Sequence, residues 1–126
     1  MSAWQPYVDS SIMGSGQFDK AAVLSYDIAK VEAGTPGYTI TDKEIESIRE
    51  LYKTPSNAFA HGITIGGEKF FAIKADERSL YGKKGKEGIV LVKSKSCVFV
   101  AHHTETAQTP TAAIVLENLV DYVNKN

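Results

Sequence analysis

Two adjacent histidines and a nearby glutamate, His102, His103 and Glu105, are the residues whose types and spacing come nearest to metal chemistry. Imidazole and carboxylate groups are common ligands of zinc and related ions. The histidines end an apolar segment that is typical of a strand, and neighbouring residues of a strand point to opposite faces. Because the two imidazoles would diverge, the sequence indicates neither a metal site nor a cofactor.

The chain also lacks the pattern of a reactive nucleophile or a phosphate-binding loop. Cys97 lies in an apolar segment, where a thiol is a small hydrophobic group and its thiolate is disfavoured. The "GSG" of residues 14–16 follows a predicted helix, whereas a phosphate-binding loop precedes one. His61 is expected in a loop or at a strand edge. No carboxylate pair is placed by its spacing for acid–base catalysis, so we expect a protein that binds partners and is not an enzyme.

The composition indicates one globular domain over residues 1–126, because 43% of the residues are hydrophobic and 23% are charged. Fourteen basic and fifteen acidic side chains give a net charge of −1, which argues against a nucleic-acid-binding protein. A single cysteine cannot form an internal disulfide, and we find neither a signal peptide nor an apolar run of about 20 residues. A cytoplasmic location is therefore expected.

A short helix is predicted near the N-terminus. Ser2 and Gln5 form a capping box, and Pro6 falls in the first turn, where its missing N–H costs little. The glycines of "GSG" end the helix. Its apolar stripe has a four-residue spacing and is formed by Trp4, Val8 and Ile12.

Two further helices follow from the same signals. Thr41 and Glu44 form a second capping box, and the helix after them ends before Pro55, with an apolar stripe formed by Ile45, Ile48 and Tyr52. The last helix begins near Pro110, and its stripe is formed by Ala112, Leu116, Leu119 and Val123.

Seven segments have the composition and the flanking turn residues of strands. They cover residues 18–27, 29–33, 61–65, 68–76, 78–84, 87–94 and 96–103. Gly66 and Gly67 separate the third segment from the fourth and favour a tight hairpin, because both tolerate positive φ angles. The order of a helix, two strands, a helix, five strands and a helix predicts an α+β fold in which helices cover an antiparallel sheet.

The region between Gly66 and Ser96 is basic, with eight lysine or arginine residues against four acidic ones. Such charges are often only the solvated face of a sheet. Lys69, Phe71 and Ile73, however, share one strand face by period two and place apolar side chains beside charge. This pattern favours a surface that docks another protein.

The aromatic side chains near the two chain ends have two interpretations. Trp4 could anchor the first helix in the core, which is the commoner role of a helical aromatic residue, with Tyr7 at the boundary. Alternatively, Trp4, Tyr7 and Tyr122 of the last helix could pave a shallow platform between the two helices. Aromatic rings arranged in this way bind a preformed polyproline helix at little entropic cost.

Three blocks of the chain together resemble the profilin family: "WQPYVDSSIMGSG", "HGITIGGEKFFAIKADERSLYGKKGKEGIVLVKSK" and "LENLVDYV". The resemblance runs along nearly the whole chain, and the length is similar to that of fungal and protist members. It implies an α/β/α sandwich: a central antiparallel sheet of about six to seven strands, with the N- and C-terminal helices on one face and smaller helices on the other. It also implies a cytosolic protein of the actin cytoskeleton that is not an enzyme.

The resemblance implies that the chain binds monomeric actin, promotes exchange of actin's nucleotide, and sequesters actin subunits or delivers them to filament ends. It places the actin contacts at Ala60, Lys69, Phe71, Ile73, Lys74, Arg78, Tyr81, Lys83, Ala113 and Glu117. The lysines would meet acidic groups of actin, and Phe71 and Ile73 would supply buried area. Ile114 stands where related forms often carry lysine, which weakens the charge at that position.

The resemblance further implies binding of phosphatidylinositol bisphosphate, in competition with actin, at Lys69, Lys74, Arg78, Lys83 and Lys84. Proline-rich partners such as formins would bind at Trp4, Tyr7, Tyr122 and Val123. Glu32 stands in place of a tryptophan of the family's platform, and the chain ends at Asn126 without the usual terminal tyrosine. Weaker proline binding is therefore expected.

Two other functions are open on the residues alone. A small-molecule sensor domain also places helices against a five-stranded antiparallel sheet, and it would hold a buried cavity on the sheet's concave side. A trafficking adaptor subunit would dimerise through a sheet edge or a helix. An effect on actin polymerisation distinguishes the profilin-like hypothesis from both.

Overall fold

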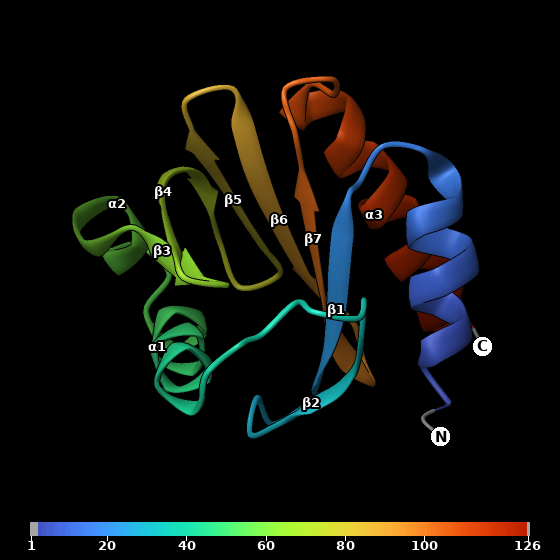
Figure 1. Ribbon diagram of the computed structural model, residues 1–126. Helices are drawn as coiled ribbons and strands as arrows, with labels where there is room; N and C mark the ends of the chain where they lie inside the picture. The colour runs from blue at the N-terminus through green and yellow to red at the C-terminus, as the bar shows by residue number, and fades with distance from the viewer. Residues whose placement is uncertain (1–2, 126) are drawn as a thin grey trace.

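The computed structural model describes residues 3–125 and contains one seven-stranded sheet in which every neighbouring pair is antiparallel (Figure 1). The strands follow the order β2-β1-β7-β6-β5-β4-β3 across the sheet. Their bounds are β1 (Lys20–Ser25), β2 (Val31–Gly34), β3 (Ile63–Ile65), β4 (Glu68–Ala75), β5 (Ser79–Lys84), β6 (Glu87–Lys93) and β7 (Cys97–His103). The predicted α+β class and the predicted number of strands are confirmed.

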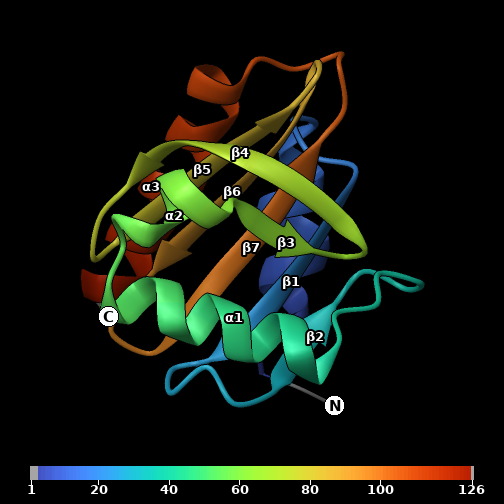
Figure 2. The ribbon, with the colours of Figure 1, turned by 90° about the vertical axis from the view of Figure 1, so that its left-hand side faces the viewer.

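The helices form a layer on each side of this sheet. They are η1 (Tyr7–Ile12), η2 (Met13–Ser15), α1 (Asp42–Lys53), α2 (Asn57–His61) and α3 (Thr109–Lys125). Figure 1 shows the blue N-terminal segment beside α3 on one side of the sheet, and Figure 2 shows α1 and α2 on the opposite side. The placement of terminal helices on one face and smaller helices on the other is therefore confirmed.

The terminal-helix layer is held by apolar side chains at the predicted spacing. Val8 and Ile12 are fully buried, and they pack in one cluster with Leu116 of α3 and Phe99 of β7. The N-terminal segment is wound as a π-helix, and the backbone N–H of Met13 reaches the carbonyl of Val8 five residues back. The spacing suggests a regular α-helix instead. The π-winding nevertheless places both apolar side chains, Val8 and Ile12, against the sheet.

Gln5 has a different role from the predicted one. Its proposed capping partner, Ser2, lies outside the described residues. The Gln5 side-chain amide donates to the carbonyl of Gly34 at 3.0 Å, and its oxygen accepts from the Gly34 N–H at 3.3 Å. Gln5 thus fastens the N-terminal helix to the edge strand β2. Gly16 ends the helical segment in the left-handed conformation, with φ of 78°, as the "GSG" pattern predicts.

The opposite layer depends on the predicted capping box of α1. The Thr41 hydroxyl accepts from the Glu44 N–H, and the Glu44 carboxylate accepts from the Thr41 N–H. The same carboxylate also accepts from the N–H groups of Gly66 and Gly67 at 3.1 and 2.9 Å. Gly66 and Gly67 have positive φ angles of 64° and 80°, as the hairpin prediction requires. Glu44 therefore joins α1 to the β3–β4 hairpin.

The structure corrects the prediction for His61, which is the last residue of the short helix α2 rather than part of a loop or strand edge. A helix of five residues is too short to show an apolar period in the sequence. It ends where Gly62 takes a positive φ of 75°. The ends of the seven predicted strands differ from the observed ones by at most two residues.

Within residues 3–125, the helices are too short or too polar to cross a lipid bilayer.

Candidate functional site

A β-bulge gives one face of β4 and β5 its composition. Phe71 pairs with Lys83, and Lys74 pairs with Tyr81, so three residues of β4 advance against two of β5 and Ile73 is the extra residue. The bulge brings Phe71 and Lys74 to the same face as Lys83 and Tyr81. We call this surface the β4–β5 face and define it by Lys69, Phe71, Ile73, Lys74, Tyr81 and Lys83.

The β4–β5 face is apolar at its centre and basic around it. Phe71 is 74% exposed, and Ile73 is also exposed, whereas the preceding residue, Phe70, is fully buried in the core. The ammonium group of Lys74 lies 5.2 Å from the centre of the Tyr81 ring, a cation–π distance, and 3.9 Å from the Asp76 carboxylate. A large apolar side chain surrounded by flexible cations is typical of a protein-docking surface.

Glu117 of α3 organises the end of this face nearest the helix. Its carboxylate accepts from Arg78 Nε at 2.9 Å, from the Ser79 hydroxyl at 2.7 Å and from the Tyr81 hydroxyl. Arg78 also donates to Asp121 at 2.9 Å. Burial first, and then the hydrogen bond and charge of Glu117, hold the pKa of Tyr81 well above its ordinary value. Three predicted actin contacts, Arg78, Tyr81 and Glu117, thus form one hydrogen-bonded network.

The other predicted actin residues differ in how much surface they offer. Ala60 is exposed on α2, close in sequence to the exposed Phe59, which sequence reasoning did not select. Ala113 is only 3% exposed because it packs in the terminal-helix core, whereas its neighbour Ile114 is largely exposed. An aromatic residue in a helix of about one turn gives no periodic signal, so Phe59 was not identifiable from the sequence.

The predicted proline-binding aromatics gather on the terminal helices. The rings of Trp4 and Tyr7 lie 5.3 Å apart and are tilted by 50°, and both stand within 6.4 Å of the buried Phe99 ring. Both rings remain half-buried, so they anchor the N-terminal helix and still reach the surface. Tyr122 is 59% exposed on α3, which lies against η1 (Figure 1). Val123, half-buried, packs against the same core as Trp4 and Tyr7.

Comparison with known proteins shows to which family the chain belongs. A sequence model with the description "Profilin" matches residues 2–126. The chain belongs to the profilin family. Profilin-P of Physarum polycephalum is 40% identical over 124 residues, which are 98% of each chain. A solved structure of Schizosaccharomyces pombe profilin matches with a TM-score of 0.93 and 39% identity over 96% of each chain.

A more distant profilin structure shares the fold alone. Mouse profilin IIa, solved in complex with a double repeat from the FH1 domain of mDia1, has a TM-score of 0.80 and 22% identity over 98% of each chain. The profilin fold is therefore kept at an identity much lower than that of the relatives above.

Glu32 lies on the short edge strand β2 of this profilin, at a bulge. The pairing of β2 with β1 shifts between Val23 and Leu24, so that Ala33 is opposite Val23, and Ala33 and Val23 share the terminal-helix core. Burial raises the pKa of the Cys97 thiol to about 11, and the nearby Glu32 charge adds to that rise. The thiolate is thus disfavoured, in agreement with the non-nucleophilic character expected of Cys97.

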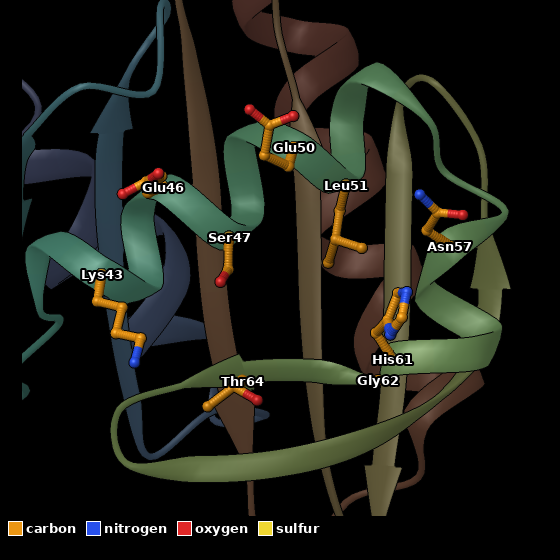
Figure 3. A pocket seen from close by; sticks show the side chains of 9 residues that line it. All are labelled: Lys43, Glu46, Ser47, Glu50, Leu51, Asn57, His61, Gly62 and Thr64. Carbon is orange, nitrogen blue, oxygen red and sulfur yellow. The ribbon is translucent and has the colours of Figure 1, made fainter.

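A separate groove opens between α1, α2 and β3 of this profilin (Figure 3). Its volume is about 350 Å³, and it is lined by Lys43, Glu46, Ser47, Glu50, Leu51, Asn57, His61, Gly62 and Thr64. None of these lining residues is a predicted site residue. The groove is open to solvent and lies beside the helices, whereas a sensor domain was expected to hold a buried cavity on the concave side of the sheet.

Proposed function

We propose that this chain binds monomeric actin through the β4–β5 face and the adjoining part of α3. The observation that carries the proposal is Phe71, which is 74% exposed on the face that also carries Lys69, Lys74 and Lys83. Burial of such an apolar side chain against a partner supplies affinity, and the surrounding charges steer the encounter with an acidic surface and fix its orientation. Membership of the profilin family supports actin as the partner.

The proposed consequence is faster exchange of actin's nucleotide. A protein that binds better to an actin conformation with an open nucleotide cleft increases the population of that conformation, and so increases the rate of nucleotide release. No residue of the profilin chain has to contact the nucleotide. The bound subunit is either withheld from spontaneous polymerisation or delivered to filament ends.

The proposal is tested by titrating the purified chain into fluorescently labelled monomeric actin. We expect slower spontaneous polymerisation and faster release of a fluorescent nucleotide, both saturating with concentration. A Phe71→Asp variant, which places a charge at the centre of the face, is expected to lose both effects while keeping its thermal unfolding temperature, because Phe71 is outside the core. Absence of both effects at tens of micromolar wild-type protein would contradict the function.

We also propose that phosphatidylinositol bisphosphate binds through Lys69, Lys74, Arg78, Lys83 and Lys84, a set that includes the three lysines of the β4–β5 face. A lysine or arginine near an anionic membrane contributes roughly 1 kcal/mol. Arg78 is held by Glu117 and Asp121, and Lys84 is paired with Glu68 at 3.2 Å. We therefore expect most of the attraction from Lys69, Lys83 and Lys74, whose contact with Asp76 is longer at 3.9 Å. Vesicles that contain the lipid should therefore compete with actin.

The third part of the proposal is a weakened proline-binding site at Trp4, Tyr7, Tyr122 and Val123. Glu32 supports the weakening, because it belongs to the edge strand that Gln5 ties to the N-terminal helix, and it offers a carboxylate where the family resemblance implies an aromatic ring. Formin-type proline-rich segments are the proposed partners, and the mouse complex with an FH1 repeat shows that another profilin accepts such a ligand.

Replacement of Glu32 by an aromatic residue should strengthen proline binding. We expect Glu32→Phe to tighten binding of a proline decamer by about 2- to 10-fold, which is the value of one aromatic contact. The change is followed by the fluorescence of Trp4, the only tryptophan in the chain. Val31→Phe is the matched control, because Val31 is exposed on the same strand and pairs with Leu24, a residue of the opposite core. Equal affinities of the two variants would refute the role of Glu32.

A further inference from the structure

The two neighbouring histidines of β7 have opposite environments. His103 faces α3, and both ring nitrogens are satisfied: Nδ1 donates to the carbonyl of Thr104 at 2.9 Å, and Nε2 accepts from the Thr109 hydroxyl at 2.7 Å. His102 faces the other side of the sheet, where its ring lies edge-on to Phe70. The predicted divergence of the two imidazoles is thus observed, and only His103 has a complete set of partners.

His102 presents an unsatisfied nitrogen. Its side chain is 1% exposed, and its Nδ1 lies 2.5 Å from a carboxylate oxygen of Asp19. Because a carboxylate only accepts, Nδ1 carries the proton, and in the neutral ring Nε2 offers a lone pair. Nε2 has no hydrogen-bond partner among residues 3–125. A buried polar atom without a partner is costly, so its surroundings indicate what it is adapted to bind.

The groups that face Nε2 are two carboxylates from other strands. Glu87 Oε1 at the start of β6 lies 3.1 Å away, and Glu68 Oε1 at the start of β4 lies 3.6 Å away. One ligand atom from each of His102, Glu68 and Glu87 falls within 4.8 Å of the other two. A lone pair and two carboxylates repel one another unless a proton on Nε2 or a metal cation lies between them.

We propose that His102, Glu68 and Glu87 form a binding site for a divalent transition-metal ion of the zinc type. Zinc bonds to imidazole nitrogen and carboxylate oxygen at about 2.0–2.2 Å, so its ligand atoms in a tetrahedral site stand roughly 3.3 Å apart. The two distances from Nε2 lie on either side of this value. The Glu87 side chain is 42% exposed and free to adjust, and water completes the coordination.

Asp19 strengthens this assignment. A metal-binding histidine ordinarily donates its other ring N–H to a carboxylate, which fixes the tautomer and raises the basicity of the ligating nitrogen. Asp19 makes this contact with Nδ1 from the residue just before β1. The ion would thereby link β4, β6 and β7 to each other, with the start of β1 holding the imidazole in position.

Two lysines limit the affinity of the site. Lys20 Nζ lies 3.6 Å and Lys84 Nζ 3.2 Å from the carboxylate of Glu68. Their charges oppose a second cation, and they partly neutralise Glu68 when the ion is absent. Lys84 is half exposed and can withdraw into solvent. Removal of the Lys84 charge should therefore strengthen metal binding. An acidic cluster with only a structural role would not show this effect.

The test is a titration of zinc chloride into the chain with His61→Gln, because His61 is an exposed imidazole that would bind zinc without specificity. We expect the imidazole nitrogen resonances of His102 to shift with saturation, those of His103 to stay, and the thermal unfolding temperature to rise. In the same background, Glu87→Gln should weaken zinc binding by about 10-fold or more, and Lys84→Gln should strengthen it severalfold. Glu105→Gln removes a nearby exposed carboxylate and is the matched control. It should leave zinc binding unchanged.

Two results would overturn the site: His102 resonances that do not move with zinc, or a zinc affinity that is the same in the Glu87→Gln and Glu105→Gln variants. The readouts involve no actin, so they are independent of the proposed function. Glu87 lies at the surface end of β6, and a folded Glu87→Gln protein is verified by an unchanged unfolding temperature in a chelator.

Discussion

Lys74→Glu is expected to weaken binding of monomeric actin by about 10-fold or more at low salt, with a smaller loss at high salt. Lys74 stands on the β4–β5 face beside Phe71, with its ammonium group over the Tyr81 ring and its side chain half exposed. Reversal of this charge opposes the encounter with an acidic partner and leaves like charges facing each other in the complex. The dissociation constant is measured at two ionic strengths by displacement of labelled actin.

Lys43→Glu is the control for this charge reversal. Lys43 is exposed on α1, on the opposite side of the sheet, and the substitution changes the net charge by the same amount. If the effect comes from local complementarity, Lys43→Glu leaves the affinity nearly unchanged. A Lys74→Glu affinity equal to that of the wild type, or an equal loss in both variants, would remove Lys74 from the interface.

The features of the fold that could be predicted are those encoded by neighbouring residues. The capping box of Thr41 and Glu44 predicts the start of α1, and Gly66–Gly67 predicts the hairpin, because each depends on two to four residues of local geometry. The π-winding of η1 and the helix α2 were not predictable. The first depends on packing against Phe99 and Leu116, and the second is a single turn without a period.

The limits of prediction are similar at the candidate sites. Period two selects Phe71 as an exposed residue, but the alignment of Lys74 with Tyr81 requires the bulge at Ile73, which only strand pairing reveals. The resemblance to profilin supplied Glu117 as a contact, yet not its bonds to Arg78 and Ser79. The carboxylates that face His102 are far from it in the sequence. Reasoning limited to its neighbours therefore missed them.

Glu117→Ala is expected to lower the free energy of unfolding by about 2–3 kcal/mol. The Glu117 carboxylate is 22% exposed and accepts three side-chain hydrogen bonds, two of them from hydroxyls of β5, whereas Asp121 is 58% exposed and accepts one from Arg78. Hydrogen bonds to a charged group are worth more when they are shielded from water, and donors left unpaired add to the loss. Asp121→Ala should therefore cost only about 0.5 kcal/mol. Equal losses in the two variants would contradict this account.

The cost of Glu117→Ala should also shrink at alkaline pH. The pKa of Tyr81 in the folded chain lies above its ordinary value of 10.0, first through burial and then through Glu117. The stability that follows from this raised pKa is fully present below pH 10.0 and is lost as the pH rises further, because the folded state then retains a proton that the unfolded state releases. Without Glu117 the pKa of Tyr81 falls towards 10.0, so the variant loses less. Tyr38, whose pKa is raised mainly by burial and not by Glu117, contributes equally to both proteins and cancels. The pKa of Tyr52 is raised first by burial and also by the Glu117 charge, so its change in the variant acts in the same direction as that of Tyr81. Urea unfolding at neutral pH and above pH 10.0 measures the difference, and a gap that widens with pH would refute the coupling.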